Sequence, residues 1–257
     1  NLLLWPKLCF FAFFFFFLKK EHAVWVLIIV VLCLDQVSKI YVKTHFRYNE
    51  EVLIGGLSWA RLHFVENEGM AFGITFDWPY GKLLLSVFRI LMVTGLIWYS
   101  HALIRMRAAA GFIYSMALIT AGALGNIIDS AFYGLIFSAS SGGYHEGDMA
   151  HWVPFGTGYG DFLHGKVVDM FFFPIRWIDI PESFPFLGGQ QFLFFSPIFN
   201  VADAAISVGV FTIFLFQGRF FKETAAEVAP LVECTAEDSA VPSPEEGAAE
   251  QPATEPQ

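Results

Sequence analysis

The residues best suited to chemistry in this chain are acids and amides that lie in otherwise apolar segments. The segment G-A-L-G-N-I-I-D places Asn126 three residues before Asp129, and F-N-V-A-D repeats this spacing with Asn200 and Asp203. Residues three apart share one face of a helix, so each pair points in one direction. Between the two segments, H-G-K-V-V-D-M places Asp169 in a short β-branched run. We expect these groups to converge near one membrane boundary.

Such groups require a partner or a task, because a polar side chain within a membrane span costs about 2–3 kcal/mol. Two carboxylates held a few ångströms apart do not both ionise readily, and they share one proton. Such a pair provides a base and an acid in one site, which activates water for peptide hydrolysis without a cofactor. The alternative for each acid is structural, as a helix cap or as the partner of Lys39 or an arginine.

The elements that must position these residues are membrane spans. The chain of 257 residues is 56% apolar and has 31 Phe, which is more than a soluble domain of this length buries. A helix needs about 18 or more apolar residues to cross the hydrocarbon layer. The sequence predicts an all-α membrane protein with four transmembrane helices, at about 23–42, 83–101, 112–136 and 197–217.

Positive charge near the ends of the spans predicts their orientation. Three pairs of cations fall on one side of the four-span arrangement, which we interpret as cytoplasmic: Lys19 with Lys20, Arg105 with Arg107, and Arg219 with Lys222. The connections at about 43–82 and 137–196 then lie outside. The first mixes β-branched and aromatic residues around a Gly-Gly turn, which predicts a small extracytoplasmic β element. Four cations fall on this outer side against the rule: Lys39, Lys43, Arg47 and Arg61.

The first span contains a further charged pair. In L-D-Q-V-S-K, Asp35 and Lys39 are four residues apart and lie on one face of the helix. They form an internal ion pair that lowers their joint cost of insertion, or they contact the substrate directly. The sequence leaves both interpretations open.

Five motifs resemble, in order, those of the lipoprotein signal peptidases. The family carries D-x-x-x-K, N-x-G-A-A-F, G-G-A-x-G-N-x-x-D-R, V-V-D-F and F-N-x-A-D, and the corresponding segments here are 35–39, 67–72, 121–130, 167–170 and 199–203. The resemblance covers about residues 23–217. Ser130 replaces the usual Arg, Met70 replaces an Ala, and the connection from 130 to 167 is longer than usual.

The resemblance implies that Asp169 and Asp203 are the catalytic pair of an intramembrane aspartyl endopeptidase. Asn67, Asn126 and Asn200 would orient the pair or bind the substrate backbone. The supporting residues would be Asp35, Lys39 and Asp129. Without the usual Arg, Asp129 is expected to lack its neighbouring cation.

The implied activity is removal of signal peptides from diacylglyceryl-modified prolipoproteins before the lipidated Cys, in the bacterial inner membrane with the site near the outer face. The expected partners are these precursors and membrane lipids, and a monomer is expected. No patch of basic and aromatic residues indicates nucleic acid. The alternatives are a small proton-coupled transporter and an inactive peptidase-like scaffold.

The remaining segments suggest three parts: a Phe-rich extension over 1–22, the membrane peptidase domain over 23–222, and a disordered tail over 223–257. The tail holds nine carboxylates and no Lys or Arg, so it accounts for the net charge of −9. The extension could be a fifth span, a signal-like segment or sequence upstream of the true start. The polar outer loop at 138–164 is interpreted as a mobile cover over the site.

Several acids and histidines in that loop could bind a metal. They are His145, Glu146, Asp148, His151, Asp161 and His164. The two histidines of H-E-G-D-M-A-H are not four residues apart, as a zinc-binding helix requires. We therefore predict a solvated loop and no metal site.

Overall fold

The fold is described from a computed structural model of the chain, for residues 20–67, 81–140, 149–182, 189–194 and 196–238. Within these described residues, four helices are long and apolar enough to span a membrane, as the sequence predicts. These spans run over Glu21–His45, Leu83–Arg105, Ala110–Ile136 and Val201–Ala226. The predicted Phe-rich extension lies almost entirely outside the described residues.

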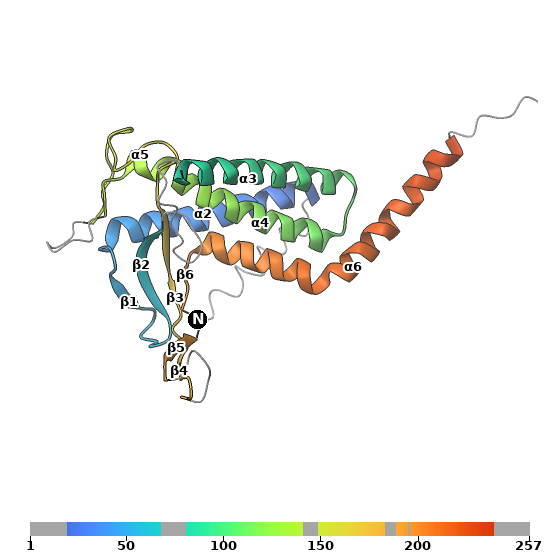
Figure 1. Cartoon of the computed structure of the whole chain (residues 1–257). Coiled ribbons are helices and arrows are strands. Elements are labelled where there is room, and N and C mark those ends of the chain that lie inside the picture. The colour runs from blue at the N-terminus through green and yellow to red at the C-terminus, as the bar shows by residue number, and fades with distance from the viewer. Residues whose placement is uncertain (1–19, 68–80, 141–148, 183–188, 195, 239–257) are drawn as a thin grey trace, which may run out of the picture.

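The helices form a bundle with α4 at its centre. Helix α4 contacts three other helices, α2, α3 and α6, and these lie alongside it in Figure 1. Their bounds are Lys20–His45 for α2, Gly81–Arg105 for α3, Ala110–Ile128 for α4 and Val201–Asp238 for α6. After α4 the chain continues through one π-helical turn, η2 at Asp129–Tyr133, into the short α5 at Gly134–Ile136.

A sheet lies at one end of the bundle (Figure 1). Its strand order is β1-β2-β3-β6, and all neighbouring strands are antiparallel. The bounds are Glu51–Leu53 for β1, Arg61–Asn67 for β2, Val167–Phe172 for β3 and Ile198–Phe199 for β6. A separate hairpin joins β4 at Arg176–Asp179 to β5 at Gln191–Phe194.

The predicted β element is thus present, but it is larger than expected. The hairpin of β1 and β2 turns at Gly55 and Gly56, whose φ values of 60° and 78° suit residues without a Cβ. The sequence did not predict that β3 and β6 would join this hairpin, because their pairing is set by long-range contacts. Consequently Asp169 lies in this sheet, and Asn200 directly follows its strand β6.

The C-terminal helix continues beyond the predicted span. Helix α6 ends at Asp238, whereas the sequence predicted disorder from residue 223 onward. Ala and Glu, which are frequent in this stretch, favour the helical state, although the stretch also contains Pro230, which does not. Residues 239–257 of the predicted tail lie outside the described residues.

Small residues allow α4 and α6 to pack closely. A Cβ added at Gly122 would lie 2.2 Å from the carbonyl oxygen of Ala202 and 2.7 Å from Cγ1 of Ile206. A Cβ added at Gly125 would lie 2.5 Å from Oδ2 of Asp35. These glycines permit close helix contact, and they bring the polar faces of α2, α4 and α6 together.

We expect Gly122→Ala to lower the free energy of unfolding by about 2 kcal/mol, because α4 must move away from the backbone of α6. Thermal unfolding in detergent micelles measures the effect. The matched control is Gly95→Ala on α3, where an added Cβ meets nothing within 4 Å. A melting temperature that falls equally in both variants would contradict the predicted close contact.

Candidate active site

The start of α6 places two of the predicted site residues. Asn200 precedes the helix, and its Oδ1 accepts a hydrogen bond from the backbone N–H of Asp203 at 2.9 Å. In return, Oδ2 of Asp203 accepts from the backbone N–H of Asn200 at 3.4 Å. This reciprocal arrangement is a capping box, and it explains the three-residue spacing of F-N-V-A-D. It fixes both side chains at the junction of β6 and α6.

Amide side chains connect the two acids of the predicted pair. Nδ2 of Asn200 donates to Oδ1 of Asp169 at 2.7 Å, and Nδ2 of Asn126 donates to Oδ1 of Asp203 at 2.9 Å. The two amides also meet each other, since Nδ2 of Asn200 lies 3.3 Å from Oδ1 of Asn126. Asn200 therefore contacts both Asp169 and Asp203, which come from elements far apart in the sequence.

Asp169 lies in β3 and is almost completely buried. Burial, with the nearby charge of Asp203 as a second cause, raises the pKa of its carboxyl group to about 7. Hydrogen bonds from Asn200 and Asn67 and the charge of Lys39 act in the opposite direction. An acid with such a pKa keeps its proton at a pH where an ordinary Asp is ionised. This is the electrostatic environment expected for one member of a proton-sharing pair.

Asn67 reaches the site from the end of β2. It pairs with Val167 in the sheet, and its side chain forms a hydrogen bond with Asp169. The rest of its motif, residues 68–72, lies outside the described residues. The sheet therefore explains how an amide from the first outer connection meets an acid from the second.

A buried charged cluster contacts the site through Asn126. Nζ of Lys39 lies 2.8 Å from Oδ2 of Asp35 and 2.8 Å from Oδ2 of Asp129, and it donates to Oδ1 of Asn126 at 2.8 Å. The side chains of Asp35, Lys39 and Asp129 are fully buried. The ion-pair interpretation of Asp35 and Lys39 thus has a structural basis.

The expectation that Asp129 lacks a neighbouring cation is wrong, because Lys39 lies against it. This contact could not be predicted, because Lys39 and Asp129 are far apart in the sequence and meet only where α2 packs against α4. Ser130 does not take the place of a cation, since its hydroxyl donates to the carbonyl oxygen of Asn126 at 3.0 Å.

Asp35 also fixes the start of α6. Its Oδ1 accepts a hydrogen bond from the backbone N–H of Ala202 at 2.8 Å. A carboxylate at this position satisfies a free N–H group of the first turn and interacts favourably with the positive end of the helix. Asp35 therefore links the Lys39 cluster to the helix that carries Asp203.

Sequence reasoning missed three residues that belong to this site. Gln36 donates to Oδ1 of Asp129 at 2.9 Å, and it accepts a hydrogen bond from the hydroxyl of Tyr133 at 3.2 Å. Arg89 of α3 interacts electrostatically with Asp203, Asp129 and Asp169. A lone Arg within an apolar span was a usable signal, whereas Gln36 and Tyr133 carry no distinctive pattern.

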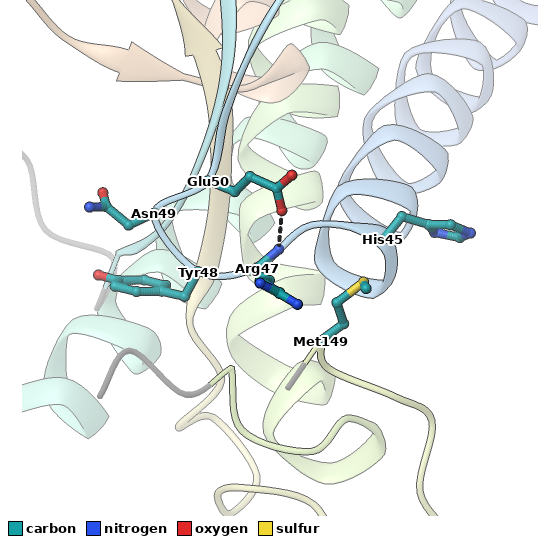
Figure 2. A pocket seen from close by; sticks show the side chains of 6 residues that line it. All are labelled: His45, Arg47, Tyr48, Asn49, Glu50 and Met149. Atoms are coloured by element: carbon teal, nitrogen blue, oxygen red, sulfur yellow. Dashed lines mark hydrogen bonds between the residues drawn. The ribbon is translucent and has the colours of Figure 1, made fainter. Parts of the chain in front are cut away.

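No group of three or more His, Cys, Asp or Glu side chains suited to a metal occurs among the described residues. His145, Glu146 and Asp148 lie outside that part of the chain. A surface hollow beyond the end of α2 is lined by His45, Arg47, Tyr48, Asn49, Glu50 and Met149 (Figure 2). Because none of the predicted site residues lines it, we do not assign the reaction to this hollow.

Comparison with known proteins adds independent information. A family model described as Signal peptidase (SPase) II matches residues 27–218. A lipoprotein signal peptidase of Porphyromonas gingivalis is 42% identical over 214 residues, which cover 83% of this chain and 90% of that protein. A lipoprotein signal peptidase of Amoebophilus asiaticus is 32% identical and covers 73% of this chain and 74% of that protein.

Among solved structures, a bacterial membrane enzyme determined by the in meso method is similar, with a TM-score of 0.48 and 18% identity. The match covers 87% of this chain and 95% of that chain. A second bacterial membrane enzyme structure has a TM-score of 0.47 and 20% identity.

Proposed function

Because this chain belongs to the signal peptidase II family, we propose that Asp169 and Asp203 are the catalytic pair with which it cleaves its substrates. The chain is an aspartic protease of a bacterial membrane, and it removes signal peptides from prolipoproteins. The transporter alternative has no support in these relationships. The observation that carries the assignment is that Asn200 contacts both carboxylates at the junction of the sheet and α6.

The proposed reaction is non-covalent. One carboxylate takes a proton from water while the water oxygen attacks the carbonyl carbon, and the protonated carboxyl donates to the carbonyl oxygen. We assign Asp169, whose pKa is raised to about 7, as the acid in the starting state, and Asp203 as the base. Collapse of the tetrahedral intermediate breaks the C–N bond: Asp203 gives the proton it took from water to the leaving nitrogen, and Asp169 takes back a proton from the gem-diol hydroxyl. This step releases the carboxylic acid and amine products and restores both carboxyls to their starting state. The reaction requires no cofactor.

The amides hold the pair in its working geometry. Asn126 and Asn200 each donate to one carboxylate, and Asn67 donates to Asp169 from the opposite strand. A hydrogen bond to a buried carboxylate fixes the orientation of its oxygens and satisfies them where water is scarce. We assign a positioning role to these residues, and a supporting role to Asp35, Lys39 and Asp129.

The pair is proposed to lie near the outer face of the inner membrane. The cations at the opposite ends of the spans, Arg105, Arg107 and Lys222 among them, favour the cytoplasm for those ends. The acyl chains of a diacylglyceryl-modified precursor would hold the scissile bond at the outer boundary, where the pair would meet it. Membrane lipids are then direct neighbours of the enzyme, which we expect to act as a monomer.

The test in cells uses Asp203→Asn with a lipoprotein reporter. We expect the uncleaved precursor to accumulate while the level of the membrane protein is unchanged, because the substitution preserves shape and removes only the ionisable group. If the protein were an inactive scaffold, cells with the unaltered protein and cells that lack it would process the reporter to the same extent. Unimpaired processing by Asp203→Asn would contradict the assignment.

The pair also predicts a pH dependence. Because the pKa of Asp169 is raised to about 7, the shared proton is held below this pH and lost above it. The value of kcat/KM should therefore fall as pH rises through about 7. In Asn67→Ala, which removes a hydrogen bond to the ionised form, the pKa should rise and this fall should occur at higher pH. A profile that is flat up to pH 9 in the unaltered enzyme would exclude the proposed acid.

A further inference from the structure

A second buried cation lies outside the proposed catalytic site. Lys43, in the last turn of α2, is fully buried although the sequence places it among the outer cations. Its Nζ forms an ion pair with Oε1 of Glu66 on β2, and Glu66 is also almost fully enclosed. A buried ion pair is costly to desolvate, so its presence at this position calls for a structural or functional reason.

The other partners of Lys43 come from the long outer loop. Its Nζ donates to Oγ of Ser140 at 3.1 Å, and it lies over the rings of Tyr159 at 4.9 Å and Phe137 at 5.5 Å. The hydroxyl of Ser140 donates in turn to Oε1 of Glu66 at 3.0 Å. The ammonium group is therefore held between strand β2 on one side and the two described ends of the loop on the other.

Glu66 on β2 and Tyr159 in the outer loop both connect Lys43 to residues of the proposed site. Glu66 precedes Asn67, and the two residues pair with Val168 and Val167 of β3. On the loop side, the hydroxyl of Tyr159 accepts from the backbone N–H of Lys166 at 2.7 Å, one residue before β3 begins. A displacement of the Lys43 side chain would thus displace Asn67 through Glu66, and it would displace Asp169 through the start of β3.

We propose that Lys43 is a positioning residue that clamps the long outer loop to β2 and thereby sets Asn67 and Asp169 in place for cleavage. The described part of the loop then acts as a fixed wall of the site rather than as the mobile cover expected from its composition. Its backbone bonds agree with this, since Val153 donates to Ile136 at 3.0 Å and Gly160 donates to Gly134 at 3.0 Å. The inference rests on the proposed catalytic pair.

The test compares Lys43→Met with Arg47→Met in the purified full-length enzyme. Arg47 is an exposed cation four residues further along, in the hollow beyond α2, and it serves as the matched control (Figure 2). For Lys43→Met we expect kcat to fall roughly 10- to 100-fold, as small displacements of reacting groups do, with KM little changed. Arg47→Met should cleave at the normal rate.

The pH profile separates positioning from simple loss of folded protein. When Asn67 is displaced, Asp169 loses a hydrogen bond that favours its ionised form, so the fall of kcat/KM should move to higher pH, as in Asn67→Ala. The other charged groups that act on the pair are Lys39 and Arg89, and Lys39 in turn is paired with Asp35 and Asp129; the substitution leaves all four side chains in place.

Two results would overturn the clamp. The first is a normal cleavage rate and a normal pH profile for Lys43→Met at equal enzyme concentration. The second is a loss of activity that is fully explained by a smaller amount of folded enzyme, while the pH dependence of kcat/KM does not change. If Lys43→Met does not accumulate, Ser140→Ala removes only the hydroxyl that joins the loop to the ion pair, and a smaller shift in the same direction is expected. If both Asp169→Asn and Asp203→Asn remain active, the proposed catalytic pair itself fails, independently of Lys43.

Discussion

Replacing either Asp169 or Asp203 by Asn is expected to lower kcat for cleavage of a diacylated precursor by roughly 10³-fold, within the range that acid–base groups contribute. The two losses should not add in the double variant, because in the proposed reaction the two carboxyls act as one unit that holds one proton. Cleavage by purified enzyme in lipid or detergent measures kcat, and precursor binding measured separately should change little.

The matched control for this loss is Asp179→Asn. Asp179 is an exposed acid on β4, where it accepts a hydrogen bond from Gln191 at 2.9 Å away from the pair. Its substitution should leave kcat unchanged. If Asp169→Asn or Asp203→Asn kept a third or more of the normal kcat, the pair could not be the catalytic acid and base.

The spans could be predicted from the sequence because their signal is local. A run of apolar residues of sufficient length identifies a span without reference to any other segment. The polar faces of Asn126 with Asp129 and of Asn200 with Asp203 were also predictable, since the three-residue spacing alone places each pair on one face. What spacing did not reveal was that Asn200 and Asp203 form a helix cap as well as a candidate catalytic face.

The partners of the buried cations could not be predicted in the same way. Lys39 meets Asp129 across 90 residues, and Lys43 meets Glu66 and Ser140 through the sheet and the outer loop. Counting Lys43 as an outer charge was reasonable from its position near the end of a span, but the structure buries it. Such contacts depend on which helices and strands become neighbours, and a single sequence does not encode this in a short pattern.

The π-helical turn at the end of the third span illustrates the same limit. Asp129 begins this turn, and its Oδ2 reaches both Nζ of Lys39 at 2.8 Å and the backbone N–H of Val168 at 3.4 Å. Asp129 therefore joins the charged cluster to β3, next to Asp169. A π-helical turn often marks a functional site, but no residue type in the segment D-S-A-F-Y predicts such a turn from the sequence.

The largest loss of stability is expected from Lys39→Met. The substitution removes the cation that lies 2.8 Å from both Asp35 and Asp129, and it leaves two buried carboxylates without compensation. Removing one partner of a buried ion pair typically costs about 3–5 kcal/mol. We expect a correspondingly lower melting temperature in detergent micelles, and loss of cleavage as α6 loses the fixed position that Asp35 gives it.

A double variant tests whether uncompensated charge is the cause of that loss. In Lys39→Met with Asp129→Asn, one of the two stranded carboxylates becomes neutral, so part of the lost stability should return even though two native side chains are missing. The control is Arg219→Met, which breaks an exposed ion pair with Glu223 and should change the melting temperature little. If the double variant were less stable than Lys39→Met alone, lost packing rather than stranded charge would account for the effect. In that case Lys39 would act mainly through its hydrogen bond to Asn126, which holds Asp203.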